Sequence, residues 1–421
     1  MTVVPNDVLA FDEHESEVRL YCRKFPAVFT RGKGAWLTSE DGRQYLDFFC
    51  GAGALNYGHN PDWILDALQS YLRDDGIVHG LDMYTSAKRT FIETFNRTIL
   101  RPRHLTYRLQ FCGPTGTDAV EAALKLARKV TGRQLVVSFT GGFHGMSCGS
   151  LAVTGSRRAR AAGSVRLQDV IFVPYEDGPG GRFDSIAYLQ RLLDDPSSGV
   201  ELPAAVIVES TQVEGGVYPA TADWLRALRS FTQERGVLLI CDEIQTGCGR
   251  TGTFFGFEHA GVQPDMVTLS KSIGGAGLPM SLNLIRPDLD VWKSGEHTGT
   301  FRGNQLAFVA GAAALAVWQD SSFLWRLERL SARMSAFAGR LRDIDAGIVT
   351  RGRGMILGID VNRSGGAGRA EKIQQRCFAE GLIVELCGRG DEVIKLMPPL
   401  TIEEEHLEQG LSLVETAIRQ A

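Results

Sequence analysis

A lysine that follows one apolar run and an aspartate that closes another are the two residues of this chain best placed to do chemistry together. Lys271 follows the run that ends in VTLS and precedes the glycine-rich stretch SIGGAGLP, and Asp242 closes the run VLLICDE. Burial favours the neutral, nucleophilic form of a lysine, which can then attack a carbonyl group. A carboxylate beside a pyridine nitrogen keeps it protonated, so that the ring becomes an electron sink. The pair indicates a Schiff-base enzyme that uses pyridoxal phosphate (PLP).

A phosphate-bearing cofactor also needs donors for its phosphate. Thr115, Gly116 and Thr117 lie where a predicted strand runs into the helix DAVEAALKLARKV. Free backbone N–H groups at a helix start favour an anion, and a glycine lets the backbone approach it closely. A plain capping arrangement, Thr115 with Asp118 or Asp118 with Glu121, explains the same residues. Both interpretations stay open on this segment alone.

The ring of the cofactor needs a flat partner and a donor to its 3-oxygen. The loop after LVVSFT offers Phe143 for stacking, with His144 beside it, and Gln245 lies three residues after Asp242. Ligands of α/β sheets bind outside the carboxyl ends of the strands, which is where these residues are expected. An aromatic residue after a strand is often only core, and an aspartate there often only caps a helix.

A second glycine motif, GCGRTG, satisfies the dinucleotide fingerprint GxGxxG through Gly247, Gly249 and Gly252. The fingerprint requires a long helix directly after it, but TFFGFEHAG follows, with a further glycine and three phenylalanines. We therefore expect no nicotinamide cofactor at this place. No GxxxxGK[ST] motif occurs, so the sequence does not support a P-loop ATPase.

The composition is that of an ordinary globular enzyme. The chain has 421 residues, 44% hydrophobic and 22% charged, with a net charge of −4, which gives no reason to expect nucleic-acid or membrane partners. Its eight cysteines show no CxxC spacing, and neither HExxH nor another compact set of metal ligands is present, so we expect no disulfides and no metal site. The N-terminus lacks a basic segment followed by an apolar one, so a cytoplasmic protein is expected.

The order of the predicted elements indicates an α/β fold. From residue 61 to 319 strands alternate with helices, which predicts a largely parallel, doubly wound sheet with helices on both faces. Residues 1–60 and 320–421 are predicted to form a second, small α+β domain, with helices over residues 370–380 and in TIEEEHLEQGLSLVETAIRQ. Apolar residues recur at helical spacing in SFLWRLERLSARMSAFAGRLRDI and predict a packing stripe: Leu324, Leu327, Leu330 and Met334.

Six segments together resemble the class III PLP-dependent aminotransferases of fold type I: GPTGTDAVEAALKLARK, GGFHGM, VIVESTQVEGG, CDEIQTGCGRTG, LSKSIGGAGLP and GTFRGN. The resemblance implies a large domain around a mixed, mostly parallel seven-stranded sheet, a small domain built from both termini, and a homodimer that shares its active sites. It implies that Gly116 and Thr117 hold the phosphate and that Phe143 stacks on the ring. Asp242 would meet the pyridine nitrogen, Gln245 the 3-oxygen and Lys271 the aldehyde. It also places Thr115, His144 and Glu214 among the cofactor-binding residues, and Thr300 at the phosphate of the neighbouring subunit.

Within this class, FCGAGALNYGHN, GLDMYTSAKRTFIETF, LDVWKSGEHTGTFRGNQLAFV and IKLMPPLTIEEE look most like the diaminobutyrate–2-oxoglutarate aminotransferases of ectoine biosynthesis. The resemblance implies transfer of the amino group of L-glutamate to L-aspartate β-semialdehyde in two ping-pong half-reactions. An ornithine- or 4-aminobutyrate-like activity, another aldehyde of secondary metabolism and a PLP aminomutase remain alternatives.

Four positions depart from the pattern of the class in ways that bear on the substrate, and one of them is Val213, which replaces the usual glycine before Glu214 and is expected to reshape the pocket wall. Met146 stands where many relatives have an arginine for a distal carboxylate, and Lys395 where an arginine usually meets the α-carboxylate. A lysine offers charge without the bidentate fork of arginine. Arg302 stands where many relatives have glycine. We hypothesise that Arg302 and Lys395 divide the recognition of the two substrates' carboxylates, the alternative for Arg302 being a surface or interface ion pair.

Overall fold

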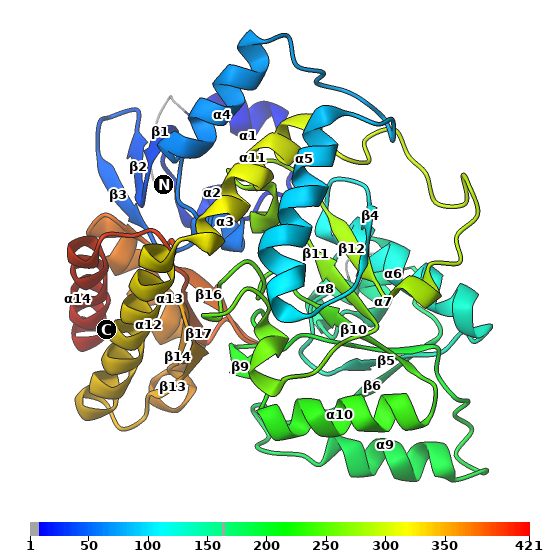
Figure 1. The fold of residues 1–421 in the computed structure, drawn as a ribbon. Helices are drawn as coiled ribbons and strands as arrows, with labels where there is room; N and C mark the ends of the chain where they lie inside the picture. The colour runs from blue at the N-terminus through cyan, green and yellow to red at the C-terminus, as the bar shows by residue number, and fades with distance from the viewer. Residues whose placement is uncertain (1–7, 162–164) are drawn as a thin grey trace.

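A seven-stranded sheet forms the centre of the computed structural model, which describes residues 8–161 and 165–421 (Figure 1). In spatial order its strands are β4 (Arg108–Phe111), β12 (Leu282–Ile285), β11 (Met266–Leu269), β10 (Leu238–Asp242), β7 (Ala205–Val208), β5 (Val136–Phe139) and β6 (Val170–Val173). All neighbouring strands are parallel except that β12 is antiparallel to both β11 and β4. The expected α/β fold with a mixed, mostly parallel sheet is confirmed.

Helices cover both faces of this sheet because its strands are apolar on both sides. In β10, Leu238 and Ile240 pack in one core cluster with the apolar face of α6 (Gly116–Thr131), whereas Leu239 and Cys241 pack in another with α10 (Ala222–Glu234). Alternate side chains of a strand point to opposite faces, so a continuous apolar run is what a strand buried on both sides needs.

The remaining helices between residues 50 and 320 flank the sheet or connect its strands. Helix α11 packs against α4 and α5, far from it in sequence. Their bounds are α3 (Cys50–Gly53), α4 (Asp62–Arg73), α5 (Ser86–Phe95), α7 (Cys148–Val153), α8 (Arg157–Ala161), α9 (Ser185–Asp194) and α11 (Gln305–Ala316), and a two-stranded ribbon joins β8 (Thr211–Gln212) to β9 (Tyr218–Pro219).

Both ends of the chain build a second group of elements. Strand β15 pairs in parallel with β3, so a C-terminal strand completes an N-terminal sheet in the order β1-β2-β3-β15. A further sheet has the order β13-β14-β17-β16, and α12 and α14 lie side by side near it (Figure 1). Their bounds are α1 (Leu9–His14), α2 (Tyr21–Lys24), β1 (Phe29–Lys33), β2 (Trp36–Ser39), β3 (Gln44–Asp47), α12 (Ser321–Ile344), β13 (Val349–Arg353), β14 (Ile356–Asp360), α13 (Gly366–Ala379), β15 (Leu382–Ile383), β16 (Glu385–Cys387), β17 (Val393–Leu396) and α14 (Glu404–Gln420). A domain division at residues 60 and 319 stays a prediction.

Two details of the predicted helices differ from the structure. Helix α13 begins at Gly366, four residues before the predicted start. Leu324 is 42% exposed, so its expected place in the packing stripe of α12 is wrong. The buried positions of α12 run through Phe323, Leu327 and Leu330, which follow the helical period, and Leu324 is turned about 100° away from that face.

The segment that carries GxGxxG forms turns at Gly249 and Gly252, both with positive φ, and then only a short 3-10 helix, Gly256–Ala260. The long helix of a dinucleotide site is not formed there, as expected from the sequence.

Within the described ranges, no single helix is long and apolar enough to cross a membrane. Length and composition allow a span only for the pair Gln305–Gln319 and Ser321–Ile344 taken together, and these two are bent by 82°.

A glycine in α14 provides a test of how tightly the C-terminal helix packs. A Cβ atom at Gly410 would lie 2.2 Å from Cζ of Phe48, so Gly410→Ala is expected to lower the free energy of unfolding by about 1–3 kcal/mol. Gly339 in α12 has open space around it, so Gly339→Ala is expected to raise that energy by up to about 1 kcal/mol through helix propensity. Urea denaturation of the two variants checks this, and a stabilised Gly410→Ala would contradict the packing of α14 on Phe48.

Candidate active site

Five side chains from four strand ends meet at one edge of the central sheet. Asp242 ends β10, Glu209 follows β7, and Lys271 lies two residues after β11, while Phe143 and His144 follow β5. The carboxyl ends of parallel strands meet at the same edge, which explains this convergence. The residues enclose a cavity of about 170 Å³, lined by Gly116, Thr117, Phe143, His144, Gly145, Glu209, Asp242, Ile244, Gln245, Thr246 and Lys271.

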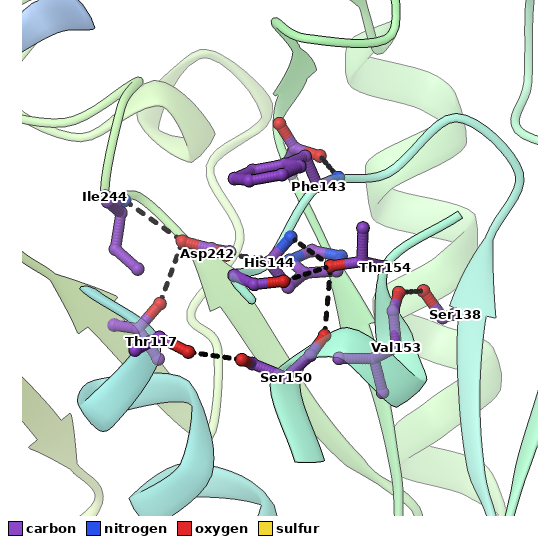
Figure 2. Close-up of polar contacts among 12 residues, drawn as sticks. Thr117, Ser138, Phe143, His144, Ser150, Val153, Thr154, Asp242 and Ile244 are labelled. Carbon is purple, nitrogen blue, oxygen red and sulfur yellow. Dashed lines mark hydrogen bonds and ion pairs between the residues drawn. The ribbon is translucent and has the colours of Figure 1, made fainter. Parts of the chain in front are cut away.

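The carboxyl group of Asp242 is held in place by three hydrogen-bond donors (Figure 2). Nδ1 of His144 donates to one oxygen at 2.7 Å, and Oγ1 of Thr268 and the backbone N–H of Ile244 donate to the other at 3.0 and 3.1 Å. Burial opposes the charged form of His144, but the hydrogen bond and the charge of Asp242 outweigh it and raise the pKa of His144. His144 thus fixes the position of Asp242 in the lining of the cavity.

Lys271 reaches the cavity from a strained backbone position. Its φ is +51°, in the left-handed region that non-glycine residues rarely adopt, between β11 and a short 3-10 helix. Its Nζ donates to the carbonyl oxygen of Ala52 at 2.8 Å, and Nε2 of Gln245 donates to the same oxygen at 2.9 Å. Burial lowers the pKa of Lys271, and the nearby charge of Glu214 only partly opposes this. The amine is thereby moved toward its neutral, nucleophilic form.

The start of α6 closes the opposite end of the cavity. Gly116 and Thr117 line it, whereas Thr115 caps the helix, its Oγ1 donating to Asp118 at 2.8 Å. The hydroxyl of Thr117 lies 2.6 Å from that of Ser147 and also meets Ser150 (Figure 2). The capping arrangement considered from the sequence therefore exists at Thr115, while the first two residues of this 16-residue helix line the cavity.

Phe143 and Glu209 form the wall beside the Asp242–His144 pair. Phe143 is 37% exposed and lines the cavity, and its N–H donates to Oε1 of Glu209 at 2.9 Å. Burial raises the pKa of Glu209 to about 7. Sequence reasoning missed Glu209, although it follows the apolar run AAVIV just as Asp242 follows its own, and the same strand-end rule would have found it. The carbonyl of Ala52 was missed as well, and no sequence signal marks it.

Glu214 and Lys395, which were expected to bind the cofactor and a substrate carboxylate, lie together next to the cavity rather than in its lining. Nε2 of Gln245 donates to Oε1 of Glu214 at 3.1 Å, and Nζ of Lys395 lies 2.6 Å from the same oxygen. Lys395, fully buried in β17, also lies 2.9 Å from Oε2 of Glu385. Both carboxylates raise the pKa of Lys395 against the effect of burial. The positive charge of Lys395 is thus already paired with two carboxylates. A substrate carboxylate could reach it only if one of these partners moved away.

Arg302 and Thr300 lie outside the lining of the cavity in this single chain. Thr300 is exposed. Nε and Nη1 of Arg302 are buried without a hydrogen-bond partner among the described residues. Burial and then the charge of Arg302 lower the pKa of His297 to about 4, which places this guanidinium near His297. The roles predicted for Arg302 and Thr300 remain predictions.

Glu243, the neighbour of Asp242, provides a pH test of the buried strand end. It accepts hydrogen bonds from Gly256 N–H at 2.8 Å and Thr246 Oγ1 at 2.7 Å, yet burial outweighs them and raises its pKa to about 7 from 4.5. At pH values between about 4.5 and 7, Glu243 holds a proton in the folded protein that it releases in the unfolded chain. The stability that this proton gives is full below about pH 4.5 and is lost as the pH rises through about 7, with a slope of up to about 1.4 kcal/mol per pH unit. Glu243→Gln is expected to flatten this fall in unfolding free energies measured from pH 5 to 8, and equal slopes in both proteins would contradict the assignment.

The fold and the site define a PLP-dependent transferase of fold type I. The site combines a lysine moved toward its neutral form, an anchored carboxyl group at the end of a parallel strand and a helix start on a small cavity. The chain belongs to the family Aminotransferase class-III, whose model matches residues 21–418. It is 51% identical to the diaminobutyrate–2-oxoglutarate transaminase of Bordetella parapertussis over 418 residues, 99% of this chain and 96% of that protein. It is 52% identical to an uncharacterized aminotransferase of Sinorhizobium fredii, over 98% of this chain and 92% of that one. Among solved structures, the ornithine aminotransferase of Toxoplasma gondii has a TM-score of 0.83 at 26% identity, over 97% of this chain and 93% of that one.

The residues present fit PLP, the cofactor of this family. The cavity is lined by the amine of Lys271, the carboxyl group of Asp242 and the helix start at Gly116 and Thr117, which match an aldehyde, a pyridine nitrogen and a phosphate in turn. A side chain at Gly116 would press on Ile244, since its Cβ would lie 3.0 Å from that residue. Both the chemistry of the lining and the space at the helix start suit the group.

Proposed function

We propose that this protein transfers the amino group of L-glutamate to L-aspartate β-semialdehyde, giving L-2,4-diaminobutyrate and 2-oxoglutarate. The observation that carries the proposal is identity near 50% over nearly the full length with transaminases of that name from several bacteria, among them Bordetella parapertussis and Streptomyces anulatus. The buried cluster of two acids and a lysine beside the cavity supports a substrate that carries charged groups at the end remote from the reaction.

Each residue of the site has a proposed task. Lys271 would bind the cofactor aldehyde, and Nζ, once released, would carry a proton from the substrate carbon that bears the reacting amine. Bound PLP supplies an electron sink for the charge that this proton leaves behind. Asp242 would keep the pyridine nitrogen protonated, and His144 would hold Asp242 in place. Gly116 and Thr117 would hold the phosphate, with Thr115 nearby. Phe143 would stack on the ring, and Gln245 would donate to the 3-oxygen.

A homodimer is the proposed working form, with Thr300 completing the phosphate site of the neighbouring subunit. Exposed apolar side chains near the cavity mouth and in the segment that carries Thr300 support it: Phe143, Met146 and Phe301. A second subunit would cover exposed apolar side chains of this kind.

Purified holoenzyme supplied with L-glutamate and L-aspartate β-semialdehyde tests the proposed reaction. Chromatography is expected to show 2,4-diaminobutyrate and 2-oxoglutarate in equal amounts. Amination of succinate or glutamate semialdehyde in preference to aspartate semialdehyde would replace the proposed substrate. Activity that needs no 2-oxo acid or amino donor would indicate an aminomutase instead.

Arg302 is proposed to bind a substrate carboxylate, because its buried nitrogens have no partner among the described residues. Arg302→Ala is expected to raise the KM for glutamate and for the semialdehyde by about tenfold, the effect of one charge-assisted hydrogen bond. Arg419→Ala on the exposed face of α14 is the matched control and should leave both constants unchanged. Unchanged KM values in Arg302→Ala would mean that Arg302 serves only packing or an interface.

A further inference from the structure

A buried carboxylate, Glu385, lies beside the active site without a task in the proposed reaction. It begins β16, and its side chain is 5% exposed. A lone acid inside the apolar run LIVELC is costly to bury unless something compensates its charge. The compensation within the described chain is incomplete, and this is the starting point for a further site.

The only cation beside Glu385 in the described part of the chain, Lys395, is shared with a second acid. Nζ of Lys395 lies 2.6 Å from Oε1 of Glu214 and 2.9 Å from Oε2 of Glu385. The second contact is an ion pair without the geometry of a hydrogen bond, and Oε2 of Glu385 is buried with no hydrogen-bond partner of good geometry among the described residues. Glu385 therefore retains an unused acceptor although it touches an ammonium group.

The charges of this cluster do not balance. Two carboxylates face one lysine, and the next amine along, Lys271, is moved toward its neutral form because burial lowers its pKa. Burial raises the pKa of Glu385, and the charge of Lys395 opposes this rise only in part. A further positive group would stabilise the anionic form of Glu385 and restore the balance.

The cluster connects to the reacting end of the site through a short series of contacts. Nζ of Lys271 and Nε2 of Gln245 share the carbonyl oxygen of Ala52, and Nε2 of Gln245 also donates to Glu214, which pairs with Lys395. Tyr21, which is 43% exposed, lies near Glu385, because burial and then the charge of Glu385 and a hydrogen bond to it raise the pKa of Tyr21. The cluster thus adjoins the lining of the cavity at Gln245, on the side of Lys271 that these contacts define.

We propose that Glu385 binds the ammonium group of the substrate that does not react, and so makes the enzyme specific for diamino acids. The proposal rests on the proposed function, in which the terminal amine of 2,4-diaminobutyrate reacts at Lys271 and its α-ammonium group points away. The free oxygen of Glu385 accepts from that ammonium group. Glutamate, which reacts through its α-amine, has no ammonium group at its far end and makes no use of Glu385.

Matched pairs of amino donors that differ only in the α-ammonium group test this. They are 2,4-diaminobutyrate with 4-aminobutyrate, and ornithine with 5-aminopentanoate, each measured with 2-oxoglutarate as acceptor. The wild-type holoenzyme is expected to have the higher kcat/KM for the diamino member of the pair. Glu385→Gln, which keeps the shape and removes the charge, is expected to reduce that preference about 10- to 100-fold, the effect of losing a hydrogen bond to a charged group.

The controls separate recognition from a structural effect. In Glu385→Gln the kcat/KM values for 4-aminobutyrate and for glutamate are expected to change less than about threefold. Glu385→Asp keeps the charge at a shorter reach and should retain part of the preference. Glu403→Gln, which removes an exposed acid next to α14, should behave as wild type. Equal losses for both members of a pair, or an unchanged ratio, would overturn the proposal.

The same experiment distinguishes failure of this inference from failure of the proposed function. If ornithine but not 2,4-diaminobutyrate is a substrate and Glu385→Gln loses the preference for ornithine, the inference stands and the proposed function falls. If 2,4-diaminobutyrate is a good substrate and its preference survives in Glu385→Gln, the inference falls alone. A wild type without preference in either pair would also overturn the inference.

Discussion

Replacing Lys271 with alanine is expected to reduce transamination by about 10⁴-fold or more. The substitution removes the amine that the site moves toward its neutral form, and with it both the attachment of the cofactor aldehyde and the proton carrier. The purified variant should also lack the visible absorbance of covalently bound PLP. Initial rates with glutamate and the semialdehyde, together with an absorbance spectrum, measure both effects.

An exposed lysine provides the control for this variant. Lys372 lies on the surface of α13, so Lys372→Ala should match the wild type in rate and spectrum. A Lys271→Ala variant that keeps both the absorbance and the activity would show that another amine carries the cofactor.

Replacing Asp242 with asparagine is expected to lower kcat by about 10²- to 10³-fold while the protein still folds. Asparagine keeps an oxygen for the donors Thr268 and Ile244 but loses the negative charge that would hold a pyridine nitrogen protonated. It also removes the hydrogen bond and the charge that raise the pKa of His144, so that pKa should fall. Steady-state rates at saturating substrate and the pH titration of His144 by NMR measure the two consequences.

The matched control for Asp242 removes one of its donors and keeps its charge. Thr268→Val loses the hydroxyl that lies 3.0 Å from Asp242, and the expected loss in kcat is below about tenfold. An Asp242→Asn variant within threefold of the wild type would contradict a role for this charge in the reaction.

The central part of the site could be predicted because it depends on local signals. Asp242 and Lys271 each follow a continuous apolar run, and such a run predicts a strand buried on both faces whose carboxyl end opens on the ligand site. The helix start at Gly116 is equally local, since a strand, a short glycine turn and an amphipathic helix follow one another directly. The structure brings all three to one cavity.

Other parts of the site depend on contacts between distant segments, which no local pattern reveals. The carbonyl oxygen of Ala52 meets Lys271 only because the N-terminal segment folds over the sheet edge. Lys395 was expected to meet a substrate carboxylate, and no local pattern indicates that the pairing of β16 with β17 sets Glu385 opposite it as an anionic partner. Leu324 was misplaced because the packing stripe of α12 passes through Phe323, one residue away.

The most direct test follows the visible absorbance of the holoenzyme when it is mixed with one substrate at a time. Addition of 2,4-diaminobutyrate alone should remove the absorbance of the bound cofactor, and later addition of 2-oxoglutarate should restore it with release of glutamate. This result is expected if both half-reactions use the Lys271 site. An absorbance that 2,4-diaminobutyrate leaves unchanged, while another amine removes it, would contradict the proposed substrate.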